Sequence, residues 1–324
     1  MPAQPNSPNS PNSPNSSFST QLHSLQLAID STSLGAFKKC PRYYQLSIFE
    51  GWAPRLESVH LTWGILAHST IEHYHHYLTT GADHEEALHG AVLFLLKATW
   101  RNGAPWQSDH SAKNRFTLLR SMIFYLDQFG PNDPIQTIVL ANGKPAVELS
   151  FRFDSDLKTI STAEPILICG HLDRLGLFQD TPYVVDFKST QYGLSQEWFA
   201  KFTPFNQFTI YILGGRIVYK TPTAGLIVDG CQTIATTSRF QRGFVTRSDY
   251  QLEDWLRGFS FTVREMEHCA IEDYWPQRET SCDLYGGCDF RGVCSQKTPE
   301  AAQEMLHGMF HRRVWDPLQT RGDI

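Results

Sequence analysis

Gly170-His171-Leu172-Asp173 and Val184-Val185-Asp186-Phe187-Lys188 are the two stretches of this sequence that decide the fold. Between them lies Gln179-Asp180-Thr181-Pro182, whose composition is typical of a turn. The residues on both sides of this turn are rich in Ile, Leu, Val and Phe. They therefore predict a β-hairpin with strands over residues 165–178 and 183–187.

The hairpin brings three charged side chains together. If Phe178 pairs with Tyr183 across the turn, Asp173 lies opposite Lys188. Because strand side chains alternate between faces, Asp186 and Lys188 share one face, and in this register Asp173 shares it too. A cross-strand ion pair on a solvated face is one interpretation. The neighbouring residues are apolar, however, and burying charges without a ligand is costly, so a bound cation is the favoured interpretation.

Two aspartates offer the oxygen ligands that Mg²⁺ or Mn²⁺ prefers. Such an ion lowers the pKa of a water and offsets the charge that develops on a phosphate. Lys188 would orient the attacking water or stabilise the pentavalent state. The hairpin therefore predicts a metal-dependent hydrolytic site.

The overall composition sets limits on the partner and the compartment. With 41% hydrophobic residues, the 324-residue chain can bury a substantial core. A net charge of −5 gives no overall basic field, so a nucleic acid would have to be held by local Lys and Arg and by metal. We expect no membrane span and no secretory signal. A cytoplasmic, reducing setting is therefore expected, in which the seven cysteines form no disulfide framework.

The chain divides into a tail and one domain. Residues 1–24 carry a repeated Asn-Ser-Pro tract and are expected to be disordered. Residues 25–324 are expected to form a single domain, with a helical insertion at about residues 80–135. Helices are followed by strands and then by helices again, which predicts an α/β or α+β core.

Ser33 and Thr62 are the predicted N-caps of the first helix and of a long helix over residues 63–78. In the long helix, Gly64, His68 and Glu72 recur every four residues and so share one face. We expect Gly64 to allow close approach to the sheet. Glu72 would orient the imidazole of His68, although a lone histidine there is more often a half-buried packing residue.

Two further positions are candidates for contact with substrate or metal. Gln207 and Tyr211 share one face of a helix predicted over residues 205–219, where an amide and a phenol suit phosphate or base contacts. Glu148 precedes the hairpin, and it is either an additional metal ligand or a charge at a strand edge.

Cysteines near the C-terminus are separated by five residues each, at Cys282, Cys288 and Cys294. The intervening Gly286, Gly287 and Gly292 allow the positive φ angles that a tightly wrapped loop needs. Cys40, which precedes a proline, is the natural fourth thiolate. Thiolates select zinc or iron–sulfur clusters, and zinc sites usually have shorter spacings, so an iron–sulfur cluster is predicted with zinc as the alternative.

Together these motifs resemble the RecB-like branch of the PD-(D/E)XK nucleases. The hairpin resembles its G-x-x-D and D-x-K strands. Residues 64–68 resemble its G-x-x-x-H helix, and residues 207–211 resemble its Q-x-x-x-Y helix. Residues 33–41 resemble the opening of its iron–sulfur members, except that Leu34 directly follows Ser33. The match runs in the family's order from about residue 31 to residue 294.

The resemblance implies a restriction-endonuclease-like core, in which helices flank a mixed sheet. It also implies a helical N-terminal region and a C-terminal iron–sulfur loop at about residues 278–296. The metal ligands that it implies are His68, Asp173, Asp186 and the carbonyl of Phe187.

The resemblance also assigns roles to the remaining motif residues. Lys188 would assist the attacking water, and Gln207 and Tyr211 would position the substrate. A structural [4Fe–4S] cluster would be held by Cys40, Cys282, Cys288 and Cys294.

The implied activity is that of a DNA exonuclease acting on single-stranded DNA or DNA ends, in recombination, repair, CRISPR adaptation or phage DNA processing. The sequence has no G-x-x-x-x-G-K-[ST] loop, so unwinding would need a helicase or recombination partner. One rival is a non-catalytic iron–sulfur subunit that binds DNA ends in a helicase–nuclease complex. The intact Asp173, Asp186 and Lys188 argue against it. A second rival is a zinc-stabilised interaction module.

Overall fold

The computed structural model describes residues 21–22, 25–56 and 58–319. Residues 1–20 and 23–24 of the expected tail lie outside this part of the chain, whereas Gln21–Leu22 forms a short strand. In the described part, no helix combines the length and apolar character needed to cross a bilayer.

The strands are β1 (Gln21–Leu22), β2 (Leu25–Gln26), β3 (Ala28–Ile29), β4 (Trp52–Pro54), β5 (Trp100–Arg101), β6 (Ala104–Pro105), β7 (Ile135–Thr137), β8 (Val147–Lys158), β9 (Pro165–Phe178), β10 (Thr181–Thr190), β11 (Gly225–Thr233), β12 (Ser238–Thr246) and β13 (Phe310–Arg312). The α-helices are α1 (Ser31–Lys39), α2 (Pro41–Tyr44), α3 (Val59–Thr79), α4 (His84–Ala98), α5 (Arg115–Phe129), α6 (Gln196–Ala200), α7 (Asn206–Ile217), α8 (Asp249–Ile271), α9 (Arg291–Cys294) and α10 (Pro299–Met309). A π-helical turn η1 (Gln45–Phe49) and the 3₁₀ turns η2 (Glu279–Ser281) and η3 (Leu284–Gly286) complete the elements.

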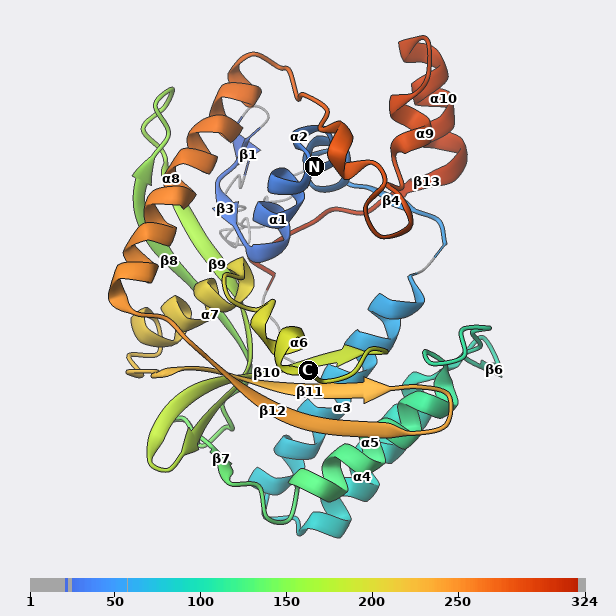
Figure 1. Cartoon of the computed structure of the whole chain (residues 1–324), viewed down its shortest axis with the longest axis vertical. Helices are drawn as coiled ribbons and strands as arrows, with labels where there is room; N and C mark the ends of the chain where they lie inside the picture. Colours follow the sequence, from blue (N-terminus) through green and yellow to red (C-terminus); the bar gives the residue numbers. More distant parts are fainter. Residues whose placement is uncertain (1–20, 23–24, 57, 320–324) are drawn as a thin grey trace, which may run out of the picture.

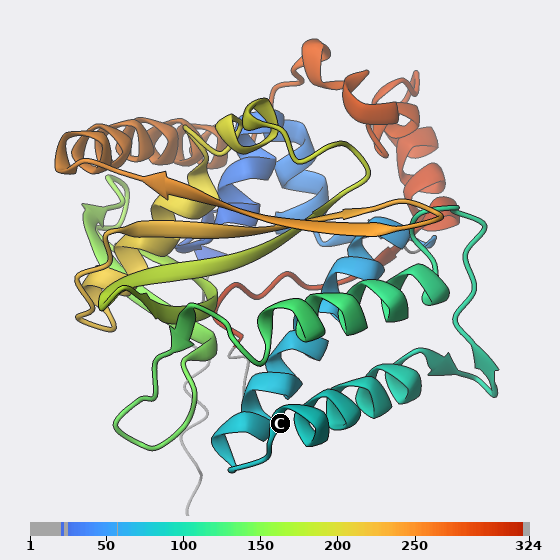
Figure 2. The ribbon, with the colours of Figure 1, turned by 60° about the horizontal axis from the view of Figure 1, so that its bottom comes forward.

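Strand β9 organises a seven-stranded mixed sheet (Figure 1). Its first part pairs antiparallel with β8, and its last part pairs antiparallel with β10. Strand β11 is parallel to β10 and antiparallel to β12. Helices α3, α4 and α5, coloured blue to green, lie below these strands in Figure 2. The predicted mixed sheet flanked by helices is therefore confirmed.

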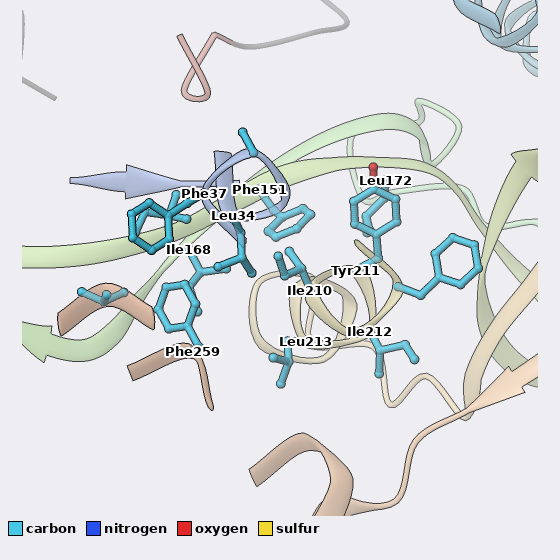
Figure 3. Close-up of a cluster of buried hydrophobic side chains, with 14 of the residues drawn as sticks. Leu34, Phe37, Phe151, Ile168, Leu172, Ile210, Tyr211, Ile212, Leu213 and Phe259 are labelled. Carbon is cyan, nitrogen blue, oxygen red and sulfur yellow. The ribbon is translucent and has the colours of Figure 1, made fainter. Parts of the chain in front are cut away.

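Two hydrophobic clusters lie on opposite faces of the sheet. Val184 belongs to the cluster that α1, α7 and α8 cover, which includes Phe37 and Phe259 (Figure 3). Phe187 belongs to the cluster under α3, α4 and α5, which includes Trp63. Because side chains an odd number of residues apart in a strand face opposite ways, this division follows from the alternation in β10.

The two ends of the described chain pack together. Strand β4 pairs antiparallel with β13. Trp52 and Leu46 share a small hydrophobic cluster with Phe290, Leu306 and Phe310. This cluster lies beside α9 and α10, at the upper right of Figure 1.

The turn of the β9–β10 hairpin is tighter than predicted. Phe178 pairs with Thr181, not with Tyr183. The turn therefore consists of Gln179 and Asp180, whose φ angles are +50° and +60°. Positive φ at both central residues is the signature of the two-residue turn whose twist best matches antiparallel strands.

This register differs from the predicted one by two residues. A shift of two keeps each side chain on its face, whereas a shift of one would reverse it. Extending the ladder beyond its last pair therefore places Asp173 level with Asp186 instead of Lys188.

Two helices begin earlier than predicted. Asp30 caps α1 by accepting a hydrogen bond from the N–H of Ser33 at 2.8 Å, so Ser33 lies inside the helix. Ser58 caps α3, whose first residue is Val59, so Thr62 is also inside its helix. Each predicted cap is a polar residue of the first turn, and an equally good cap precedes it.

Helix α7 packs so closely on β8 that there is no space for a side chain at Gly214. A Cβ atom there would lie 2.8 Å from three atoms of the Phe151 ring. We expect Gly214→Ala to lower the free energy of unfolding by about 1–3 kcal/mol.

The matched control is Gly258→Ala in α8, where a Cβ atom would meet nothing within 4 Å. This variant should be more stable than the wild type by up to about 1 kcal/mol, because alanine is the better helix former. Urea unfolding followed by circular dichroism measures both. Equal stabilities for the two variants would contradict the packing of α7 on β8.

Candidate active site

The site lies where β10 separates from β9. Arg174 of β9 pairs with both β8 and β10, so these two strands lie on opposite edges of β9. Residues 167–168 pair with both β8 and β3, so β3 lies on the same edge as β10. Arg174 is the last residue of β9 in the β10 ladder, so Asp173 lies in the interval between β10 and β3.

Asp173 joins the hairpin to α3. Its Oδ2 accepts a hydrogen bond from the N–H of Phe187 at 3.0 Å and lies 3.0 Å from Nδ1 of His68. Burial acts to raise the pKa of Asp173, but His68 and Lys188 outweigh it and hold that pKa below its ordinary value. Burial acts to lower the pKa of His68, and the charge of Asp173 outweighs it and raises that pKa. The pair is therefore stabilised in its ionised form.

Asp186 is a buried carboxylate that lacks enough donors. It is 1% exposed, and Nζ of Lys188 lies 2.6 Å from its Oδ2. Neither of its oxygens has a well-aligned hydrogen-bond donor among the described residues. Burial, aided by the charge of Asp173, raises the pKa of Asp186 to about 7. An unsatisfied buried carboxylate beside other acids is the feature that a bound cation would compensate.

Glu148 completes a group of ligand atoms. The ligand atoms of His68, Glu148 and Asp173 all lie within 4.8 Å of one another. The residues on either side of Glu148 in β8 pair with those on either side of Asp173 in β9. Glu148 is buried and has a φ of +46°, which is unfavourable for a residue other than glycine. The geometry therefore favours the interpretation as a ligand over that as a strand-edge charge.

Gln207 and Tyr211 lie on α7 as predicted, and they contact each other. Nε2 of Gln207 donates to the Tyr211 hydroxyl at 2.9 Å. Burial, followed by the charges of Asp173 and Asp186, raises the pKa of Tyr211 well above its ordinary value. The hydroxyl therefore stays protonated, and it is a donor close to the two carboxylates.

One expectation for α3 is wrong, and the other stays a prediction. Glu72 lines the same pocket as His68, and its Oε1 lies 3.8 Å from Nε2 of His76, whereas the contact of His68 is with Asp173. A Cβ atom at Gly64 would meet no described atom within 4 Å, so Gly64 does not serve close packing against the sheet.

A buried ion network under the site was not predicted. Nε of Arg242 lies 2.6 Å from Asp229, whose other oxygen accepts from the Tyr125 hydroxyl at 2.5 Å. NH1 of Arg174 lies 3.2 Å from Asp133. These residues come from β9, β11, β12, α5 and a loop, so nothing in the local sequence pairs them. They hold the strand next to Asp173 against its neighbours.

We expect Glu148→Gln to weaken Mn²⁺ binding by at least about tenfold, because the change removes a carboxylate from the ligand group. Glu72→Gln is the matched control, since Glu72 lines the same pocket but pairs with His76. Isothermal titration with Mn²⁺ measures both. Equal affinities in the two variants would exclude Glu148 as a ligand.

The four predicted cluster cysteines line one separate pocket, namely Cys40, Cys282, Cys288 and Cys294. Cys40 follows α1, and its Sγ accepts from the N–H of Arg278 at 3.4 Å. Gly286 and Gly287 have φ angles of +88° and +105°, as predicted, whereas Gly292 lies in α9. The remaining cysteines, Cys169, Cys231 and Cys269, are buried elsewhere in the core.

Comparison with known proteins identifies the family of this chain. A family model described as the PD-(D/E)XK nuclease superfamily matches residues 31–295. A crystal structure of a "Putative exonuclease" from Eubacterium rectale is similar, with a TM-score of 0.48 and 10% identity over 85% of this chain and 92% of that chain. No curated protein matches the sequence. The family model spans the hairpin, the histidine helix and the cysteine loop, and this chain therefore belongs to the PD-(D/E)XK nuclease superfamily.

Proposed function

We propose that the protein is a Mg²⁺- or Mn²⁺-dependent DNA exonuclease that hydrolyses phosphodiester bonds of single-stranded or end-processed DNA. The observation that carries this proposal is the His68, Glu148 and Asp173 group beside the buried ion pair of Asp186 and Lys188. Hard oxygen donors with one imidazole suit a divalent cation that also accepts phosphate oxygens.

The residues divide the chemistry among them. His68, Glu148, Asp173 and Asp186, with the carbonyl of Phe187, would hold the cation. When bound, the cation lowers the pKa of water and neutralises charge on the phosphate.

Lys188 reaches the same point from β10, where its ammonium orients the attacking water and stabilises the negative charge of the transition state. The protonated hydroxyl of Tyr211, fixed by Gln207, donates to the substrate and positions it.

We also propose that the cysteine pocket holds a [4Fe–4S] cluster. The four cysteines line one pocket, and the last three are separated by five residues each. Zinc sites usually have shorter cysteine spacings, which supports a cluster over a single zinc ion. Bound there, the cluster would clip α1 to the C-terminal loop and brace that end of the fold.

The choice of an exonuclease over a non-catalytic end-binding subunit rests on the chemistry that is retained. A subunit that only binds DNA ends has no need for a buried, unsatisfied Asp186 beside Lys188, because that arrangement destabilises the fold. The preference for ends and for single strands comes from the family resemblance. Duplex unwinding would fall to a helicase or recombination partner, and DNA substrate and free thiols both fit the cytoplasm.

The test uses end-labelled linear DNA and closed circular DNA, each single- and double-stranded, with Mg²⁺, Mn²⁺ or EDTA. Protein is purified without oxygen to keep the cysteine pocket intact. Metal-dependent loss of linear DNA alone is the expected result. Cutting of circles would replace the exonuclease with an endonuclease, and binding without cleavage of any substrate would favour the end-binding subunit.

A further inference from the structure

A buried lysine lies beside the C-terminal end of β10, the strand that carries Asp186 and Lys188. Lys113, in the segment before α5, is 3% exposed, and its Nζ donates to the Ser189 hydroxyl at 2.7 Å. The ammonium also lies 3.6 Å from the centre of the Trp63 ring of α3. Ser189 directly follows Lys188. No carboxylate in the described ranges is within ion-pair distance of Lys113, although burying an unpaired charge is costly.

Two histidines, His60 and His110, lie close to this lysine. The rings of His60 and His110 are 5.0 Å apart, edge to face. Nδ1 of His110 accepts from the N–H groups of Ala112 and Lys113, so its own proton lies on Nε2. Nε2 of Gln191 is placed 3.1 Å from that nitrogen. Two N–H groups cannot bond each other, so the amide is assigned the other way round, with its oxygen accepting from His110. The N–H₂ group of Gln191 and the ring of His60 then face solvent.

Lys113 carries the positive charge of this group, and no carboxylate among the described residues pairs with it. Burial lowers the pKa of His60, and His110 and Lys113 lower it further. Burial lowers the pKa of Lys113 to about 8, so most of it is protonated at neutral pH. His60 lies in the first turn of α3, which contains no acidic residue and is the positive end of the helix dipole. An anion bound there would relieve this field.

We propose that His60, backed by His110 and Lys113, forms a subsite for a backbone phosphate of the DNA strand, separate from the phosphate that is cleaved. This subsite rests on the proposed function, because it presupposes a nucleic-acid substrate. Along α3, His60 lies about 12 Å from His68. An extended single strand advances further per nucleotide than a B-form strand, which advances about 3.4 Å, so the phosphate in the subsite lies at most a few nucleotides from the scissile one. His60 touches the phosphate, and Lys113 supplies charge from behind.

We expect His60→Gln and Lys113→Met each to weaken the binding of a single-stranded oligonucleotide by about three- to tenfold. In Lys113→Met, the slope of log K against log salt should also fall by about 0.7, the value for one lost phosphate contact on a single strand. Matched controls are His89→Gln on α4 and Lys158→Met on β8, which are exposed and outside the cluster. Fluorescence anisotropy in a Lys188→Ala background measures binding without cleavage.

The deciding experiment places a neutral methylphosphonate at successive positions of the oligonucleotide. At one position, the neutral linkage should weaken binding to the Lys188→Ala protein. At that same position, it should leave binding to the Lys188→Ala, His60→Gln double variant unchanged. Identical position profiles in the two proteins would overturn the subsite. His60 is exposed, so its variant keeps the test valid even if Lys113→Met fails to fold.

Cleavage of unmodified DNA by the wild type is scored separately. Cleavage without a His60-dependent position removes the subsite and leaves the nuclease. A His60-dependent position without cleavage by the wild type removes the nuclease and leaves the subsite.

Discussion

Lys188→Ala is expected to lower the rate of DNA cleavage by at least about a hundred- to a thousandfold, the loss typical of removing one preorganised charge from a transition state. The ammonium lies 2.6 Å from Asp186 and is the charged donor that β10 brings to the proposed metal ligands. A second effect acts in the same direction. Lys188 opposes the rise in the pKa of Asp186 that burial causes, so its removal raises that pKa further and weakens Asp186 as a ligand.

Single-turnover cleavage in Mn²⁺ measures the rate, and anisotropy in EDTA measures DNA binding, which should persist. Lys158→Ala is the matched control, since it removes an exposed lysine from β8. A Lys188→Ala rate within tenfold of the wild type would remove Lys188 from the chemistry.

Cys288→Ser is expected to lose the iron and to lower the free energy of unfolding by more than about 4 kcal/mol, the size of effect that loss of a structural metal gives. The pocket that includes Cys288 joins residues around Cys40 to the loop before α9. Beyond this pocket, the chain ends are joined by a small hydrophobic cluster, by the β4–β13 pair and by Trp275, which packs on Phe37 and Tyr44. Without the iron–sulfur cluster, the two chain ends should separate at a lower temperature than the one at which the sheet unfolds.

Metal analysis of anaerobically purified protein, together with thermal unfolding, measures both effects. Cys169→Ala is the matched control, because Cys169 is buried in β9 and outside the pocket. It should keep its iron. Zinc in place of iron in the wild type would replace the cluster with a zinc site, and an iron-loaded, equally stable Cys288→Ser would contradict either site.

The parts of the site that could be predicted depend on fixed periodicity. A strand repeats every two residues, so Asp186 and Lys188 share a face whatever the register, and the error of two residues at the turn left Asp173 beside them. Helices place residues four apart on one side, which is why Gln207 and Tyr211 were correctly paired.

The parts that could not be predicted depend on the path of the backbone and on contacts between distant segments. Glu148 lies near His68 at a position of positive φ, and no pattern of residue types encodes that angle. The network of Arg242 and Asp229 crosses strands whose register was unknown. Caps were misplaced because Asp30 precedes the predicted Ser33 as an equally polar candidate.

The metal site is tested most directly by the anomalous scattering of Mn²⁺ soaked into crystals of the wild type with a single-stranded oligonucleotide. We expect a peak bounded by His68, Glu148, Asp173 and Asp186, with a phosphate beside it and Lys188 on its far side. A protein that cleaves DNA in Mn²⁺ but shows no peak among these residues would contradict this metal site, because its metal-dependent chemistry would then lie elsewhere.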